Sequence, residues 1–291
     1  MIKKTVAALL MSLSAAAMAM PLGSQSVLVV EDDTGKILVE KNANAVVPIA
    51  SLTKLMTAMV VLDAKQDMNE EIEIDKEDVD TLKHSTSRVP VGAAIPRGDV
   101  LQLALMSSDN RAAASLGRTY PGGTPAFKAA VNAKIRALGL TQTVIEEPTG
   151  LSPNNKSTAS ELVKMAAAAS KYEAIRRMTT DKNEIINIKG RKVEYHNTNR
   201  LVGAKGWDIG MSKTGYTEEA GRCLIMRITS AGKNATLVLL NAKANSARLM
   251  DAFNIRRFIS GAEEEAKPRV MRASSRKKAP ATKNPRRRRA S

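Results

Sequence analysis

The chain has 291 residues, enough for one large domain or two closely packed subdomains with a sizeable core. Hydrophobic residues make up 43% and aromatic residues only 3%, so aliphatic side chains and the 14 Met must fill that core. The net charge is +16, but 11 Lys or Arg and no acid lie in residues 267–291, which leaves only +3 on residues 20–266. A body so mildly basic argues against a nucleic-acid-binding protein, and no nucleic acid is expected as a partner.

The N-terminal segment has the features of an export signal. Two lysines precede an uncharged apolar stretch, residues 5–17, and Ala17-Met18-Ala19 has the small-x-small form of a cleavage site. We expect residues 1–19 to be a cleaved signal peptide and the protein to act in the periplasm. The alternatives are an ordinary N-terminal helix or a membrane anchor, but the apolar run is short for a bilayer. No later stretch is apolar enough to span, so no transmembrane helix is expected in the mature chain.

Strand-forming segments open the body of the chain. Residues 26–30 and 36–40 are rich in β-prone side chains, and Asp32-Asp33-Thr34-Gly35 between them has turn chemistry, which predicts a hairpin. Residues 51–64 are apolar and free of Gly and Pro, so they predict a buried helix that starts near Ser51.

The remaining elements predict an α/β (α+β) fold in which the two ends of the chain share one sheet. The middle is helical, with helices expected at residues 98–106, 111–116, 125–138 and 159–171 and a Pro- and Gly-rich loop at residues 147–157. The C-terminal half returns to strands at residues 209–214, 222–229 and 235–241, followed by an amphipathic helix at residues 246–259. We expect the helical segment to be inserted between the two groups of strands, and the whole domain to cover residues 20–262.

The C-terminal segment, residues 263–291, is expected to be a disordered polybasic tail because it lacks apolar periodicity and ends in four arginines. One interpretation is a solvated tail without a partner. The other is an electrostatic tether to an anionic wall polymer or membrane surface. The tail has no apolar face that would insert into a bilayer.

Three short motifs occur in order along the body: Ser51-Leu52-Thr53-Lys54, Ser108-Asp109-Asn110 and Lys213-Thr214-Gly215. Each is weak alone, since Ser-x-x-Lys also occurs at 230–233, 274–277 and 275–278. Their contexts distinguish them, because they fall at a helix start, an inter-helix turn and the end of a strand.

Ser51 and Lys54 have the arrangement of a nucleophile and its base. A spacing of three places both side chains on one helical face. A serine hydroxyl needs a nearby base, and burial lowers the pKa of a lysine enough for it to act as one. The chain has only two histidines, and neither lies in a serine-hydrolase motif. The alternative, a capping serine and a surface lysine, does not explain the apolar residues around Lys54.

The other two motifs can complete such a site. Ser108 can supply a hydroxyl for proton transfer, and Asn110 an amide that holds a substrate backbone. Lys213 gives positive charge, Thr214 a hydrogen bond to a substrate carboxylate, and Gly215 room for close backbone approach. Taken alone, the same residues fit a capped turn and a strand end.

The motif set and its surroundings resemble the low-molecular-mass penicillin-binding proteins. The similarity covers roughly residues 24–259 and includes residues 48–58, the loop at 147–152 and the Tyr216-Thr217 pair that follows the third motif. Residues 105–116, followed by Tyr120-Pro121-Gly122-Gly123, are most similar to the periplasmic D-alanyl-D-alanine endopeptidase branch.

The resemblance implies a five-stranded antiparallel sheet flanked by helices, with the site beside an inserted helical cluster. It implies that Ser51 attacks a D-alanine carbonyl with Lys54 as base, while Ser108 passes the proton to the leaving amine. The N–H groups of Ser51 and Tyr216 would form the oxyanion hole. Substrate binding would fall to residues of the third motif and the two that follow it: Lys213, Thr214, Gly215, Tyr216 and Thr217.

The same resemblance implies peptidoglycan peptide stems or cross-links as substrate, β-lactams as covalent inhibitors, and no metal or organic cofactor. DD-endopeptidase and DD-carboxypeptidase activity both remain open on these motifs. A β-lactamase is disfavoured because Glu146 and Glu147 are followed by Pro148-Thr149-Gly150 and not by the Glu-x-x-Leu-Asn pattern of class A enzymes. A non-catalytic wall-binding protein that works through its tail is the remaining alternative.

Overall fold

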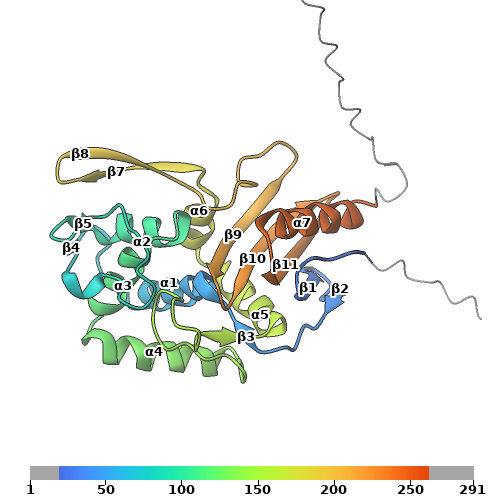
Figure 1. Cartoon of the computed structure of the whole chain (residues 1–291), viewed down its shortest axis with the longest axis horizontal. Coiled ribbons are helices and arrows are strands. Elements are labelled where there is room, and N and C mark those ends of the chain that lie inside the picture. Colours follow the sequence, from blue (N-terminus) through green and yellow to red (C-terminus); the bar gives the residue numbers. More distant parts are fainter. Residues whose placement is uncertain (1–19, 262–291) are drawn as a thin grey trace, which may run out of the picture.

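The computed structural model describes residues 20–261, coloured from blue to red in Figure 1. The predicted signal peptide, residues 1–19, and the predicted polybasic tail, residues 263–291, lie outside the described residues. Among the helices that are described, none is long and apolar enough to cross a membrane.

A five-stranded antiparallel sheet joins the two ends of the described chain, as predicted. Its strand order is β2-β1-β11-β10-β9, so a hairpin from the start of the chain pairs with a three-stranded meander from its end. The contact between the two groups is the β1–β11 ladder, in which Leu28 is paired with Val238. The strands are β1 (Ser26–Glu31), β2 (Ile37–Lys41), β9 (Asp208–Thr217), β10 (Gly221–Ser230) and β11 (Lys233–Ala242).

Both faces of the three central strands, β1, β11 and β10, are largely buried, because these strands carry apolar residues on both sides. Val27 and Leu237 point to one face, where they pack against Ile255 of α7 (Asn245–Ile259). Leu28 and Val238 point to the other face and belong to the larger core, which the helical part of the chain completes. Figure 1 shows α7 on one side of the sheet and α5 on the opposite side.

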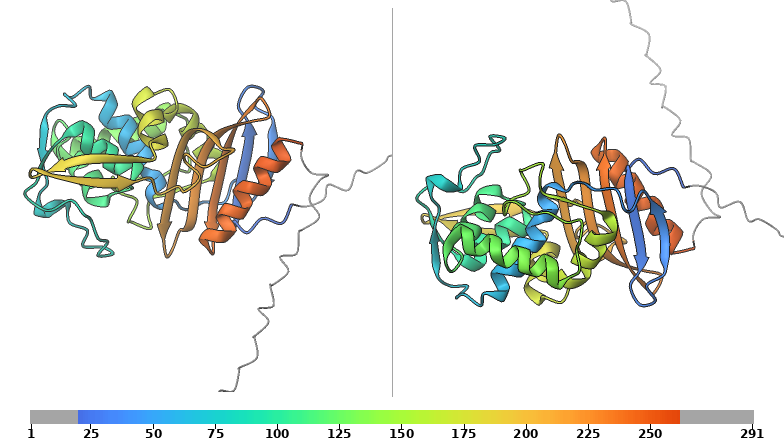
Figure 2. Two further views of the ribbon diagram at one scale, coloured as in Figure 1. Left: turned by 90° about the horizontal axis from the view of Figure 1, so that it is seen from above. Right: turned by 90° about the horizontal axis from the view of Figure 1, so that it is seen from below.

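The helical part is inserted between β2 and β9 and forms a second body beside the sheet (Figure 2). The helices predicted for this part lie close to their expected ranges, except that the helix expected from Ser51 begins with a 3₁₀ turn; η2 and α6 are additional. The helices are η1 (Ala50–Thr53), α1 (Lys54–Asp63), η2 (Lys76–Asp78), α2 (Arg97–Met106), α3 (Asn110–Arg118), α4 (Gly123–Ala137), α5 (Ala159–Ala169) and α6 (Glu173–Thr180).

Short strand pairs connect the loops of this part. The strand β3 (Val47–Pro48), just before η1, pairs with β6 (Lys156–Ser157), and β4 (Glu71–Glu73) pairs with β5 (Ala94–Pro96). The residues between β4 and β5 form a long excursion that returns to the same small sheet.

Helix α6 and a long hairpin were not expected from the sequence. The hairpin consists of β7 (Asn183–Ile188) and β8 (Arg191–His196), which extend over the helical part in Figure 1. Lys189 and Gly190 form its two-residue turn, and both have positive φ, as a type I′ turn requires.

Candidate active site

Ser51 is the only residue of η1 that is not buried. Its position depends on an unusual backbone, because the preceding Ala50 has φ of 47°, a left-handed conformation that non-glycine residues rarely adopt. A Cβ on Gly150 would lie 2.0 Å from the carbonyl oxygen of Ala50. The loop that contains Gly150 therefore packs directly behind the residue that presents Ser51.

Lys54 lies one turn further along and is buried, with 1% of its surface exposed. Its Nζ donates to Ser51 Oγ at 2.8 Å, to Asn110 Oδ1 at 2.7 Å and to the Thr149 carbonyl at 2.7 Å. Burial lowers the pKa of Lys54 to about 8, although nearby carboxylates, Glu147 foremost, partly oppose the shift. A substantial fraction of this amine is therefore neutral near pH 8 and can accept the Ser51 proton.

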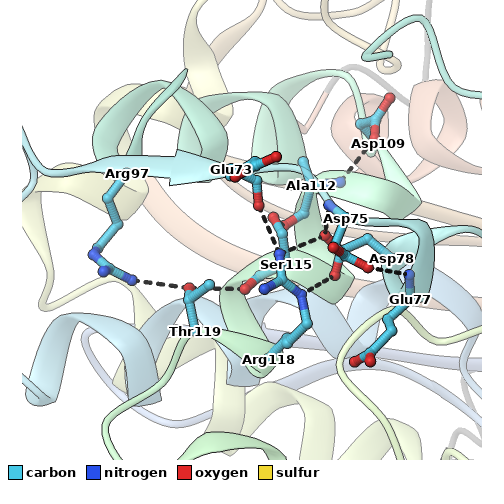
Figure 3. A network of polar contacts seen from close by, with 10 residues as sticks. All are labelled: Glu73, Asp75, Glu77, Asp78, Arg97, Asp109, Ala112, Ser115, Arg118 and Thr119. Carbon is cyan, nitrogen blue, oxygen red and sulfur yellow. Dashed lines mark hydrogen bonds and ion pairs between the residues drawn. The ribbon is translucent and has the colours of Figure 1, made fainter. Parts of the chain in front are cut away.

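Asn110 is the first residue of α3, and this helix is fixed at both ends (Figure 3). At its start, the Asp109 side chain accepts a hydrogen bond from the Ala112 N–H at 2.9 Å. At its end, Arg118 makes a bidentate pair with the buried Asp78, at 2.9 and 2.8 Å. These contacts hold the Asn110 amide against Lys54.

Ser108 and Lys213 form a second pair. The Lys213 Nζ donates to Ser108 Oγ at 2.8 Å, and Ser108 has φ of 60°, so its backbone is strained as well. Burial lowers the pKa of Lys213 well below its usual value, and the positive charges of Lys54 and Arg248 add to the effect. The serine of the second motif thus contacts the lysine of the third.

Gly215 allows the sheet to reach the nucleophile. A Cβ at this position would lie 3.0 Å from the Ile49 carbonyl oxygen and 3.1 Å from the Ser51 nitrogen. The strand β9 is also the last in the sheet order, so its outer edge has no described strand beside it. Thr214 precedes Gly215 in β9, and the Thr214 hydroxyl donates a hydrogen bond to Thr198 Oγ1 at 2.7 Å.

The last two predicted residues lie at the rim of the site. Tyr216 is 50% exposed and is covered on one ring face by the guanidinium of Arg222, 3.6 Å from the ring centroid. Thr217 is nearly buried, and its hydroxyl accepts a hydrogen bond from the Ala220 N–H at 3.1 Å. Thr217 therefore shapes the β9–β10 turn in this structure.

The loop behind the site is organised by Glu147. Its carboxylate accepts hydrogen bonds from the N–H groups of Thr149 and Gly150, both at 2.7 Å, and from Asn155 Nδ2 at 3.0 Å. A cavity of about 240 Å³ lies beside this loop, and Asn110 and Thr149 contribute to its wall. No group of three or more metal-ligating side chains occurs among residues 20–261.

The structure brings the predicted residues of all three motifs to one place, in two hydrogen-bonded groups. Ser51, Lys54 and Asn110 form the first, and Ser108 and Lys213 the second. Sequence reasoning did not identify four further contributors. They are the Thr149 carbonyl, the Ser85 hydroxyl that accepts from Asn110 Nδ2 at 2.8 Å, Thr198 and Arg248. Of these four, only Thr149 could have been suspected from the sequence, because it lies in the loop at residues 147–152 that resembles the penicillin-binding proteins.

Comparison with known proteins decides the family. The family model described as D-alanyl-D-alanine carboxypeptidase, peptidase family S11, matches residues 13–244. The chain belongs to peptidase family S11. Similar proteins include the D-alanyl-D-alanine endopeptidase of Pseudomonas aeruginosa, 43% identical over 87% of this chain and 82% of the relative. The D-alanyl-D-alanine endopeptidase of Escherichia coli is 41% identical over 82% of this chain and 77% of the relative.

Solved structures agree with this S11 assignment. The Streptomyces K15 DD-transpeptidase superposes with a TM-score of 0.76 at 25% identity, over 82% of this chain and 97% of that one. Penicillin-binding protein D2 from Listeria monocytogenes, in its ampicillin-bound form, gives a TM-score of 0.71 at 26% identity, over 82% and 98% of the two chains. The predicted resemblance to low-molecular-mass penicillin-binding proteins and the predicted fold class are confirmed.

Proposed function

We propose that this protein is a serine DD-peptidase that hydrolyses D-alanyl peptide bonds in peptidoglycan, chiefly as an endopeptidase that cuts cross-links. The observation that carries the proposal is the 2.8 Å hydrogen bond between Ser51 Oγ and Nζ of the buried Lys54. Relatives named as endopeptidases support the choice of bond.

Ser51 and Lys54 would carry out the acylation. The neutral Lys54 amine takes the Ser51 hydroxyl proton as the oxygen attacks the D-alanine carbonyl. The resulting oxyanion is placed beside the N–H groups of Ser51 and Tyr216, which come from segments that Gly215 allows to approach closely. Collapse of the tetrahedral intermediate breaks the C–N bond and leaves an acyl-enzyme on Ser51, and water then hydrolyses this ester, which releases the peptide as a carboxylic acid and restores the Ser51 hydroxyl.

Proton delivery to the departing amine is assigned to Ser108. Ser108 would regain the proton that it gives up from the Lys54 ammonium, which received it from Ser51, while Lys213 Nζ, 2.8 Å from Ser108 Oγ, orients the hydroxyl. Arg248 adds positive charge near Lys213 and the adjoining Thr214, an environment that suits a substrate carboxylate.

The part of the β9 edge beyond Ser212, whose N–H is already bonded to Thr179 Oγ1 of α6, offers a place for the peptide substrate. An extended chain can pair with the main chain of an exposed strand, which fixes its position without demanding particular side chains. Asn110 would hold the opposite side of the peptide, since its amide is already oriented by Lys54 and Ser85.

Glu147 argues against a β-lactamase. Both of its carboxylate oxygens accept main-chain hydrogen bonds within their own loop. A carboxylate engaged in this way is poorly placed to activate a deacylating water. β-Lactams would therefore form a persistent adduct with Ser51.

A DD-carboxypeptidase that removes terminal D-alanine is the second candidate, because relatives such as the one from Bacillus subtilis, 29% identical, carry that name. Purified sacculi separate the two activities. Loss of dimeric muropeptides supports the endopeptidase, whereas loss of pentapeptide stems alone contradicts it.

The decisive test of the nucleophile is intact mass spectrometry after incubation with benzylpenicillin. We expect one penicilloyl adduct on the wild type and none on Ser51→Ala. Intact penicillin and no adduct on the wild type would contradict the proposal and favour a non-catalytic wall-binding protein. Consumed penicillin without an adduct would indicate a β-lactamase.

The domain limits and the location are part of the proposal. Residues 1–19 would direct export to the periplasm, residues 20–262 would form the catalytic domain, and the tail at residues 263–291 would contact an anionic wall or membrane surface. N-terminal sequencing of protein from the periplasm tests the first limit, with Met20 as the expected first residue. Loss of sacculus binding on deletion of residues 263–291 tests the role of the tail.

A further inference from the structure

An ion pair joins the helical part of the protein to the sheet near the end of β9. Lys83 Nζ lies 2.6 Å from Glu219 Oε1, and the two side chains are 28% and 41% exposed. Lys83 belongs to the excursion between β4 and β5, and Glu219 to the turn between β9 and β10. The pair therefore connects the helical part of the protein to the sheet.

The segment that contains Lys83 is tied to the helical part along its length. At the start of this segment, Asp78 is paired with Arg118 of α3. Further along, the Asp80 side chain accepts hydrogen bonds from the N–H groups of Lys83, at 3.0 Å, and Ser85, at 2.8 Å. The Ser85 hydroxyl then accepts from Asn110 Nδ2. Lys83 is thus two residues from Ser85, which contacts Asn110 of the proposed active site. A large movement of the Lys83 main chain would therefore disturb the Ser85–Asn110 hydrogen bond.

Glu219 is equally close to the residues that β9 contributes to the site. It follows Thr217 by two residues, at the end of the strand that contains Lys213 and Gly215. Both panels of Figure 2 show the β4–β5 excursion, in cyan, projecting on the same side of the molecule as the end of β9. A peptide extended along the free edge of β9 would meet the Lys83–Glu219 pair as it passes Thr217.

We propose that Lys83 and Glu219 determine substrate specificity by bridging the helical part and the sheet at the Thr217 end of β9, which restricts how much peptide and glycan extends beyond that residue. This inference rests on the proposed function. Exposed ion pairs are weak, so a bulky substrate can displace the pair, and the expected discrimination is only about two- to fivefold. The pair would act on the size of the substrate and leave the chemistry at Ser51 unchanged.

The experiment compares one large and one small substrate. The kcat/KM for intact sacculi and for a short N-acylated D-alanyl-D-alanine peptide is measured for the wild type, Lys83→Met and Glu219→Gln. Lys233→Met serves as a matched control, because this exposed lysine is the first residue of β11 and is paired with Ser230, at the opposite end of β10 from Glu219. The rate of acylation by benzylpenicillin reports whether the site itself is intact.

We expect both variants to raise the sacculus-to-peptide ratio of kcat/KM about two- to fivefold, with the penicillin rate and the control unchanged. An unchanged ratio in an active enzyme overturns this inference alone, as does an equal loss on both substrates and on penicillin. A wild type that neither acylates nor cleaves the short peptide overturns the proposed function, and this inference with it.

Discussion

Gly150 lies so close to Ala50 that a Cβ on the glycine would be 2.0 Å from the alanine carbonyl oxygen. The two residues are far apart in the sequence, yet their main chains meet directly behind Ser51. Ala50 has a left-handed φ of 47°, which the packing of this loop helps to maintain. The conformation that presents Ser51 is therefore supported from outside its own helix.

Gly150→Ala should displace Ser51. The added methyl group has no space, so Ala50 must move, and misplacement by about 1 Å costs roughly a hundredfold in rate. Gly139→Ala is the matched control, since Gly139 also has positive φ but no atom near its Cβ position. In both variants the left-handed backbone of the new alanine lowers the free energy of unfolding by about 1 kcal/mol. Thermal unfolding measures this shared loss of stability, so a slower acylation seen only in Gly150→Ala reports the displacement of Ser51. Equal acylation rates in the two variants would contradict this account.

Gly215→Ala should separate β9 from η1 by a smaller amount. Its Cβ would lie 3.0 Å from the Ile49 carbonyl oxygen, a contact that a shift of a few tenths of an ångström relieves. We expect acylation by benzylpenicillin to slow by about tenfold. Gly210→Ala, on the same strand, has its nearest contact at 4.0 Å and should acylate at the wild-type rate. Slower acylation in both variants would indicate a general requirement for glycine in β9 and would contradict a specific role for the contact between Gly215 and Ile49.

The pH dependence of acylation should report the ionisation of Lys54. Only the neutral amine can accept the Ser51 proton, so the rate should rise with pH to a plateau, with a midpoint near the Lys54 pKa of about 8. Lys54→Arg, which stays protonated, should be inactive throughout. A midpoint near 10.5, the ordinary lysine value, would show that burial does not lower the pKa.

The same shift makes stability depend on pH. The folded pKa of Lys54 is below the unfolded value, so between about 8 and 10.5 the unfolded state binds more protons. The contribution of Lys54 therefore makes the free energy of unfolding rise with pH across that window. Below pH 8 the penalty for the buried charge is fully present. Chemical denaturation at pH 7.5 and pH 9.5, compared with Lys54→Met at the same two values, isolates this contribution.

Asn110→Asp should move the acylation profile to higher pH. Asn110 Oδ1 lies 2.7 Å from Lys54 Nζ, so a carboxylate there would stabilise the ammonium and raise the Lys54 pKa by about one to two units. Activity at pH 7 should fall and partly recover above pH 9. Ser85→Ala removes the other partner of Asn110 without adding charge, and its midpoint should stay near that of the wild type. A shift of equal size in both variants would mean that position, and not charge, is responsible.

Much of the fold followed from local patterns. The first hairpin, the helices α1 to α5 and the C-terminal meander lie close to the predicted ranges, because apolar periodicity and turn residues act over a few positions. Helix α6 was missed because residues 173–180 contain few apolar side chains. The β7–β8 hairpin was missed although Lys189 and Gly190 form a two-residue turn, and its exposed strands carry little of the alternation that marks a buried sheet.

The sequence by itself predicted the pairing of Ser51 with Lys54, because a spacing of three places the two side chains on one helical face. Tertiary structure alone decided what surrounds them. Asn110 and Thr149 reach Lys54 across 56 and 95 residues, and these contacts accompany the burial that lowers its pKa. Nor could spacing reveal that Lys83 meets Glu219, 136 positions away. Such contacts depend on how separate elements pack, and packing is set by the whole core rather than by any short stretch of the chain.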